Sequence, residues 1–168
     1  RHGKWRNLLR KGQKQDVPLE KVTEKSEILK LIEIYIKFQK ERGFHGVGEN
    51  LLTGILKLTD MNITLSVYKT LSLRDSSTTG FVFIATTGNT ATYLVGWTNI
   101  EGRDQQSNYL LLWRAISEAK RVKMNWFDLG GLNANTPKGI SHFKKGMKGQ
   151  SYKNLGEFYT FPIVPWFI

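Results

Sequence analysis

Hydrophobic and polar positions follow two different periods along the chain, and the changes of period divide it into helices and strands. Apolar residues at helical spacing predict helices over residues 4–14, 26–42, 49–59, 109–122 and 137–147. Alternating or continuously apolar runs predict strands over residues 17–22, 61–68, 81–87, 91–97, 126–130 and 157–163. The polar residues 98–108 predict a loop.

The order of these elements predicts the fold class. A chain that passes from the strand at 91–97 through the helix at 109–122 to the strand at 126–130 makes a right-handed crossover, so those two strands are parallel. The preceding strands are expected to form an antiparallel meander, with one hairpin turn at Gly88-Asn89. We therefore predict an α/β fold with a mixed, mostly antiparallel central sheet that is flanked by helices.

Local signals add expectations about helix ends and about the core. Thr23 or Ser26 is expected to cap the second helix, and Gly43 to end it. Four aromatic side chains are expected in the core: Tyr93, Trp97, Tyr109 and Trp113.

Composition narrows the chemistry that the chain can perform. Its 168 residues suit one domain with a buried core. It has no cysteine, which excludes disulfides, zinc-thiolate sites, iron–sulfur clusters and thiol nucleophiles. The three histidines, His2, His45 and His142, lack ligand spacing, and no metal site is expected. No apolar run approaches the ~20 residues that span a bilayer.

The charge of the chain is concentrated near its two ends. The formal net charge is +11, from 25 lysines and arginines against 14 acidic residues. Residues 1–15 contain six cations and residues 138–153 contain five, and neither segment contains an acid. Outside these segments cations and acids are equal in number. Such segments attract the phosphates of RNA, nucleotide-linked substrates or lipid headgroups, or they are solvated faces.

Five motifs, in order along the chain, resemble a known family. They are Trp5–Lys11, the helix start Asn108–Trp113, and then Asn125–Gly131, Thr136–Gly139 and His142–Gly146. Together they resemble the Fem family of peptidoglycan-bridge peptidyltransferases, of the FemA, FemB and FemX types, and its GNAT-fold relatives. His142 stands where that family usually has an arginine, and Met147 where it has an aromatic residue.

The resemblance implies a GNAT-like acyltransferase fold and a particular domain organisation. Two GNAT-like domains are expected in the parent protein, and residues 16–168 would form the second of them. Residues 1–15 would form a basic interdomain helix. The N-terminal GNAT-like domain would then be a missing partner of this chain.

The resemblance also implies roles for side chains near both ends of the chain. Lys144 would supply an ammonium that stabilises the oxyanion of acyl transfer, and Phe143 would shape the pocket. Consecutive helix residues point to different faces, so only one of Lys144 and Lys145 can point inward. Arg6 would contact a nucleotide-linked acceptor, and we expect folding to gather Lys144 and the arginines beside one crevice that binds anions. The other residues expected to bind substrate are Trp5, Arg10, Tyr109, Gly130 and Gly131.

Asp128 ends a predicted strand before a glycine pair, and two interpretations of it remain open. As a catalytic base it would take a proton from an acceptor amine. As a structural residue it would cap the following helix or pair with a lysine. Gly130 and Gly131 would let a substrate or a main-chain segment approach closely.

Three functions are consistent with these observations. The resemblance implies transfer of an aminoacyl group from aminoacyl-tRNA to an amine of a nucleotide- or lipid-linked cell-wall (peptidoglycan) precursor, with no permanently bound cofactor. The first alternative is an acyl-CoA-dependent N-acyltransferase of surface-polysaccharide or lipid biosynthesis. Against it, residues 98–108 lack the usual glycine-rich phosphate motif, and their Glu101 and Asp104 would repel a pyrophosphate. The second alternative is a non-catalytic RNA- or partner-binding domain. We expect a cytoplasmic protein, and peripheral association with the inner face of the membrane stays open.

Overall fold

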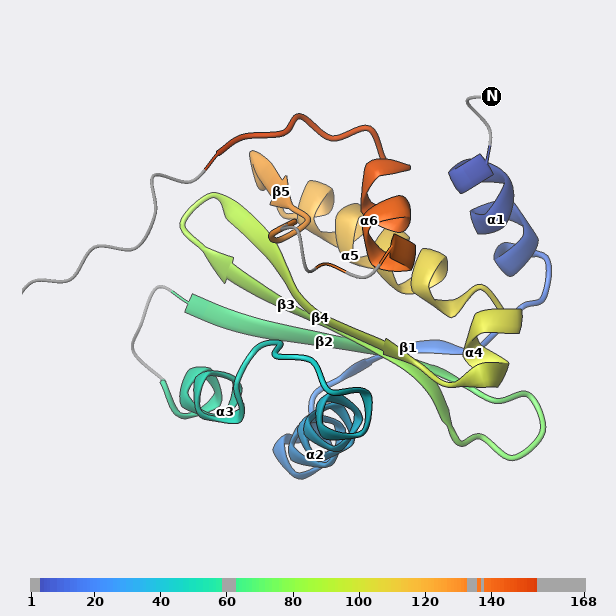
Figure 1. Ribbon diagram of the computed structural model, residues 1–168, viewed down its shortest axis with the longest axis horizontal. Helices are drawn as coiled ribbons and strands as arrows, with labels where there is room; N and C mark the ends of the chain where they lie inside the picture. Colours follow the sequence, from blue (N-terminus) through green and yellow to red (C-terminus); the bar gives the residue numbers. More distant parts are fainter. Residues whose placement is uncertain (1–3, 59–62, 133–135, 137, 154–168) are drawn as a thin grey trace, which may run out of the picture.

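A five-stranded sheet crosses the protein and has helices on both faces (Figure 1). The computed structural model describes residues 4–58, 63–132, 136 and 138–153. Its helices are α1 (Lys4–Gln13), α2 (Lys25–Arg42), α3 (Glu49–Lys57), α4 (Ile100–Asp104), α5 (Ser107–Arg121) and α6 (Lys138–Lys145). Its strands are β1 (Leu19–Val22), β2 (Ile63–Leu71), β3 (Thr78–Thr87), β4 (Thr90–Thr98) and β5 (Trp126–Asp128). This arrangement confirms the predicted α/β fold class.

The strands lie in the order β1-β2-β3-β4-β5, and each neighbouring pair except the last is antiparallel. β4 and β5 are parallel, as the crossover through α5 predicts. Their pairing covers only Thr90–Thr92 on β4 and Trp126–Asp128 on β5. Further along β4, the register with β3 shifts by one residue, which leaves Leu94 as a bulge. β4 and β5 are therefore paired only at the start of β4, and β4 bends at the bulge beyond this pairing.

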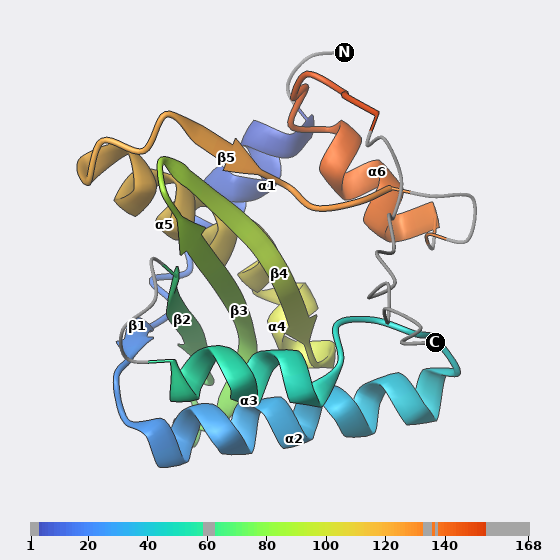
Figure 2. The ribbon, with the colours of Figure 1, turned by 90° about the vertical axis from the view of Figure 1, so that its left-hand side faces the viewer.

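The sheet separates two hydrophobic cores, one on each face (Figure 2). α2 and α3 pack on one face against Phe81 and Phe83 of β3. Trp97, which was expected in the core, stacks on Phe81 with ring centres 5.1 Å apart and packs against this first core. α5 packs on the other face against Val82 and Ile84. β3 thus buries side chains on both faces, as its continuous apolar sequence predicts.

The predicted helix and strand ends differ from the structure by a few residues. Gly43 ends α2 in the left-handed conformation, with φ 62°, as predicted. The predicted cap is wrong: Glu24 precedes α2, and its side chain makes no capping hydrogen bond. The predicted strand at 157–163 lies outside the described residues.

Two further expectations are wrong in the region of α4 and α5. Residues 98–108 are not a loop, because α4 and the start of α5 occupy them. Asn99 begins α4 by accepting a hydrogen bond from Gly102 N at 2.7 Å, so a polar residue that suggested a loop serves as a helix cap. Trp113 is 46% exposed rather than buried. It lies off the apolar stripe of α5, which is formed by Leu111, Leu112, Ala115 and Ala119.

α4 packs on the end of the sheet through close main-chain contact and a polar network. Gly102 is buried, and a Cβ atom there would lie 2.1 Å from the carbonyl oxygen of Thr79 in β3. Glu101 accepts hydrogen bonds from Ser72 Oγ at 2.8 Å and from Gln105 Nε2 at 3.1 Å. Glu101 therefore bonds within the protein instead of facing an approaching phosphate.

Gly102→Ala should destabilise the protein, because the added methyl group meets main-chain atoms that cannot rotate away. We expect the free energy of unfolding to fall by about 1–3 kcal/mol, the usual cost of overpacking. Gly54→Ala in α3 is the matched control, because no atom lies within 4 Å of the added carbon and alanine stabilises a helix by up to ~1 kcal/mol relative to glycine. Urea denaturation of both variants tests this expectation, and equal midpoints would contradict it.

Candidate functional site

Lys144 of α6 lies close to both β4 and the loop that follows β5. Its Nζ donates a hydrogen bond to the carbonyl oxygen of Gly131 at 3.0 Å. The same nitrogen lies 5.7 Å from the centre of the Tyr93 ring on β4, within range of a cation–π interaction. The side chain is partly buried, and this burial lowers the pKa of Lys144, whereas the carboxylate of Asp128 acts in the opposite direction. The structure therefore holds an incompletely solvated amine beside the point where β4 and β5 separate.

The loop after β5 can approach β4 because Gly130 has no side chain. Its φ is 74°, a left-handed conformation that favours glycine. A Cβ atom there would lie 2.9 Å from the carbonyl oxygen of Tyr93 and 3.4 Å from Lys144 Nζ. Gly131 has a different role: its carbonyl oxygen accepts the hydrogen bond from Lys144 Nζ. The close approach expected of this glycine pair is therefore an approach of the protein's own main chain.

Asp128 holds this loop in place through both of its carboxylate oxygens. Oδ1 accepts a hydrogen bond from Gly130 N at 2.7 Å, and Oδ2 accepts one from the hydroxyl of Tyr152. The bond to Asp128 raises the pKa of the Tyr152 hydroxyl. Of the two interpretations of Asp128, these contacts support the structural one. Asp128 was expected to cap the following helix or to pair with a lysine, but its side chain caps the turn at Gly130 instead. Asp128 also places a negative charge near Lys144.

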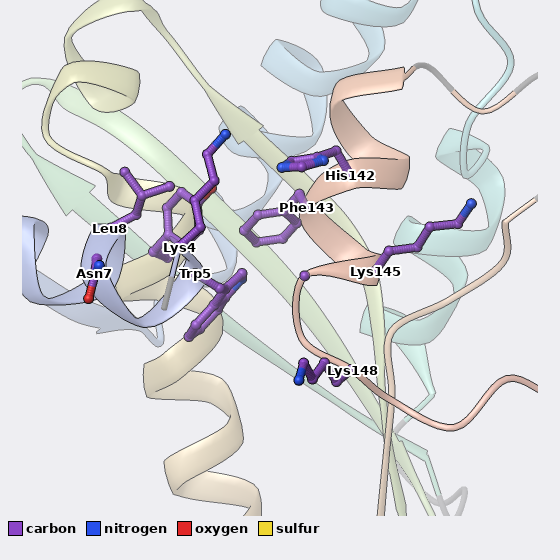
Figure 3. A pocket seen from close by; sticks show the side chains of 10 residues that line it. Lys4, Trp5, Asn7, Leu8, His142, Phe143, Lys145 and Lys148 are labelled. Atoms are coloured by element: carbon purple, nitrogen blue, oxygen red, sulfur yellow. The ribbon is translucent and has the colours of Figure 1, made fainter. Parts of the chain in front are cut away.

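A pocket of about 800 Å³ lies between α1 and α6 (Figure 3). α1 contributes Lys4 and Trp5, and α5 contributes Tyr109. Phe143 of α6 and Lys148, which follows that helix, line the other side. The two basic segments from opposite ends of the sequence therefore meet around one hollow.

α6 turns its two neighbouring lysines in different directions. Lys145 is exposed and lines the pocket with α1, and Figure 3 shows its amine extending outward. Lys144 is instead bonded to the Gly131 carbonyl. The prediction that only one of these lysines points inward is confirmed, and the inward one is Lys144.

Three aromatic rings join α1, α5 and α6 at the pocket. The ring centres of Trp5 and Tyr109 lie 5.3 Å apart and those of Tyr109 and Phe143 5.1 Å apart, both edge to face. Trp5 and Phe143 are 6.3 Å apart. Such a pair contributes about 0.5–1.5 kcal/mol beyond the burial of its surface. Burial also raises the pKa of the Tyr109 hydroxyl. Folding thus brings together three of the residues that were expected to bind substrate.

Arg6 and Arg10 do not line this pocket. They lie one turn apart on α1, and both are exposed. Lys4 is the cation that α1 places at the pocket. The described residues therefore do not form the expected single crevice of Lys144 and the arginines: α1 and α6 meet, but Lys144 contacts the loop after β5.

Lys4, Tyr93, Lys148 and Tyr152 lie near these sites but were not expected to have a role there. Lys4 and Lys148 lie in the basic segments, so the charge pattern located them without separating them from neighbouring lysines. Tyr93 was expected in the core, and burial does raise the pKa of its hydroxyl. Its ring also faces Lys144, which no periodicity could show. The bond between Tyr152 and Asp128 had no sequence signal.

The described part of the chain forms neither a metal-binding cluster nor a membrane-spanning helix. Among residues 4–58, 63–132, 136 and 138–153, no three histidine or acidic side chains cluster so that they could hold a metal ion. Over the same residues, no helix has the length and apolar character needed to cross a membrane.

The sequence pattern of the FemAB family matches residues 74–167, which is more than half of the chain. This protein belongs to the FemAB family. The matched part of the FemAB chain includes Asp128, Gly130 and Lys144, whose contacts are described above. No curated protein sequence matches the chain.

Solved structures share the fold of this FemAB protein at low sequence identity. A possible acetyltransferase from Clostridium difficile 630 is 14% identical with a TM-score of 0.59, and the match covers 85% of this chain and 98% of that one. A probable acetyltransferase is 15% identical with a TM-score of 0.57 over 87% and 97% of the two chains. An aminoglycoside acetyltransferase from an uncultured soil metagenomic sample, in complex with trehalose, is 11% identical with a TM-score of 0.57 over 88% and 97%. The predicted GNAT-like fold is confirmed, and family and fold together support acyl transfer as the general activity.

Lys144 should react with an acylating reagent at a lower pH than an ordinary lysine, because burial favours its neutral, nucleophilic form. We expect the midpoint of its labelling to lie below 10.5, the usual lysine value. Asp128→Asn should lower it further, since the carboxylate favours the ammonium and asparagine can still accept from Gly130 N. Mass spectrometry of the labelled peptide measures the midpoint, with the urea-unfolded protein as control. A midpoint at or above that of the unfolded chain, or an upward shift in Asp128→Asn, would contradict the described environment.

Proposed function

We propose that this FemAB protein transfers an aminoacyl group from aminoacyl-tRNA to an amine of a nucleotide- or lipid-linked cell-wall precursor. The observation that carries the proposal is the position of Lys144, a partly buried amine held at the separating ends of β4 and β5. Family membership supports the general chemistry. The choice of acceptor and the expectation of a preceding GNAT-like domain rest on the resemblance of the motifs.

The proposed reaction is the aminolysis of an ester. The nitrogen of the acceptor amine forms a bond to the ester carbonyl carbon, and the carbonyl oxygen becomes an oxyanion. The bond from that carbon to the ribose oxygen of the tRNA then breaks, the nitrogen loses one proton, and the ribose oxygen gains one. The products are an amide and a tRNA with a free terminal hydroxyl. The ammonium of Lys144 would stabilise the oxyanion, and its incomplete solvation strengthens that interaction.

The covering of α5 by α1 favours tRNA over acyl-CoA as donor. Enzymes of the GNAT fold that use acyl-CoA place its pyrophosphate at the start of the helix that follows the β4 strand. Here Gly12 of α1 is buried at that place, and a Cβ atom on it would lie 3.1 Å from both Gln105 O and Gln106 Cβ. Gln15 Nε2 also donates a hydrogen bond to the carbonyl oxygen of Asp104 at 3.3 Å. These contacts place α1 against the residues at the start of α5, and they support tRNA over acyl-CoA as the donor.

Lys144→Ala should lower kcat for aminoacyl transfer by about 10²–10³-fold, the usual effect of removing one oxyanion-stabilising group. The melting temperature should change little, because the lost contacts are one hydrogen bond and one ring contact at a partly buried position. Lys144→Arg, which keeps the charge, should retain part of the activity. Lys30→Ala on the exposed face of α2 is the matched control. Full activity of Lys144→Ala would remove the proposed role.

Labelled aminoacyl-tRNA should support transfer to the precursor amine, and labelled acyl-CoA should not. The intact protein is incubated with each donor separately and with the same precursor, and the labelled product is separated by chromatography. Transfer from acyl-CoA alone would establish the N-acyltransferase alternative. Strong, salt-dependent RNA binding without transfer from either donor would establish the non-catalytic alternative.

A further inference from the structure

Asp128 acts on Lys144 from nearby without contacting it directly. Its carboxylate favours the charged form of the lysine and so raises the pKa of Lys144 against the effect of burial. Yet among the ion pairs of the described residues, none joins these two side chains. Opposite charges attract strongly where water is partly excluded. Contacts to other groups therefore hold the carboxylate away from the ammonium.

Hydrogen bonds to both of its oxygens hold this carboxylate. Gly130 N donates to Oδ1 at 2.7 Å, and the hydroxyl of Tyr152 donates to Oδ2. Hydrogen bonds to an ionised carboxylate are stronger than those between neutral groups. With one donor on each oxygen, the carboxylate cannot rotate toward Lys144 without losing one of these bonds.

Tyr152 comes from the chain that follows α6, 24 residues after Asp128. This segment passes beside the chain that follows β5, because a Cβ atom on Gly149 would lie 3.8 Å from Leu129 Cδ1 (Figure 1). The side chain of Tyr152 is 70% exposed. Its ring therefore buries little surface, and its hydroxyl is the group that links it to Asp128.

The position of Asp128 decides how much of the Lys144 ammonium is available to a substrate. A lysine ammonium carries several N–H donors. Among the described residues, the Gly131 carbonyl accepts one of them, and the ring of Tyr93 faces the same nitrogen. A direct ion pair with Asp128 would occupy another donor and would offset the positive charge that stabilises an oxyanion.

We propose that Tyr152 is a positioning residue for Lys144: its hydroxyl holds the Asp128 carboxylate at the Gly130 turn and so keeps the ammonium free of an ion pair. The proposal deepens the proposed function, on which it rests, by naming the group that keeps the oxyanion-stabilising amine available. Tyr152 acts through Asp128 and is not itself a catalytic residue.

The test measures the pH midpoint at which Lys144 of the intact chain is acylated, by mass spectrometry of the labelled peptide. Among the described residues, the titratable groups that face Lys144 from other elements are Asp128 of β5 and Tyr93 of β4. Tyr152→Phe keeps the ring but frees Oδ2, so the carboxylate turns to Lys144 and favours its charged form. The midpoint should then rise by about one pH unit, the low end of the effect of a close opposite charge.

Tyr68→Phe in β2 is the matched control. It also removes a hydroxyl that is hydrogen-bonded to another side chain, that of Ser66, and its ring packs in the core beneath α5. The midpoint of Lys144 should stay at the wild-type value in this variant. Thermal melting of each variant verifies that it is folded.

The double variant Tyr152→Phe/Asp128→Asn separates positioning from packing. Asparagine has no charge with which to pair Lys144, so the midpoint should be no higher in the double variant than in Asp128→Asn alone. If Tyr152 only packed against the site, its loss would expose Lys144 to water and raise the midpoint equally in both backgrounds.

Transfer from aminoacyl-tRNA supplies the second readout. In Tyr152→Phe, kcat should fall about tenfold, the rate equivalent of a rise of one in the pKa of Lys144, while KM should change little. An unchanged or lowered midpoint in Tyr152→Phe would overturn the proposal, and so would an equal rise in the Asp128→Asn background. Because labelling needs neither donor nor acceptor, the two proposals fail separately. The expected shifts without any transfer would contradict only the proposed function, whereas transfer with an unshifted midpoint would contradict only the role of Tyr152.

Discussion

The contact among the Trp5, Tyr109 and Phe143 rings is the interaction on which the pocket between α1 and α6 depends. It joins α1, α5 and α6, which come from the beginning, the middle and the end of the chain. α5 is itself anchored on the sheet through its apolar stripe. Through these ring contacts, both basic helices pack against a helix that is itself packed on the sheet. These three rings also line the pocket between α1 and α6.

A second constraint is the short pairing of β4 and β5. Because only three residues of each strand are paired, the chain after Asp128 is free to turn at Gly130 toward β4. The carboxylate of Asp128 closes that turn, and the carbonyl of Gly131 then receives Lys144. α6 thus connects two features: an incompletely solvated amine on one side and the pocket lined by α1 on the other.

The sequence located much of this site but did not assemble it. The separation of Lys144 from Lys145 follows from helix geometry alone and is confirmed. The two basic segments were evident from charge, yet their meeting around one pocket depends on ring contacts between positions that are far apart in the chain. Arg6 and Arg10 have the chemistry expected of phosphate ligands, but α1 turns Trp5 and Gly12 toward α5 and so leaves both arginines outside the pocket. Helical periodicity predicts Trp5, Leu8 and Leu9 as the apolar side of this helix, and these side chains are buried or partly buried. It could not show that α5 and α6 are the elements that cover this side.

The sequence by itself determined the order and type of most elements, the parallel crossover from β4 to β5 and the buried character of β3. These properties depend on local periodicity and on the handedness of the chain, which nearby residues encode. Tertiary structure alone decided that α4 packs on the end of the sheet, that Asp128 caps a turn and that Lys144 contacts the loop after β5. Each of these depends on a contact with a distant segment. Gly102 of α4 lies against the carbonyl of Thr79 in β3, and Lys144 of α6 donates to the carbonyl of Gly131 in the loop after β5. A contact between residues distant in sequence has no period of its own, so only the folded chain could reveal it.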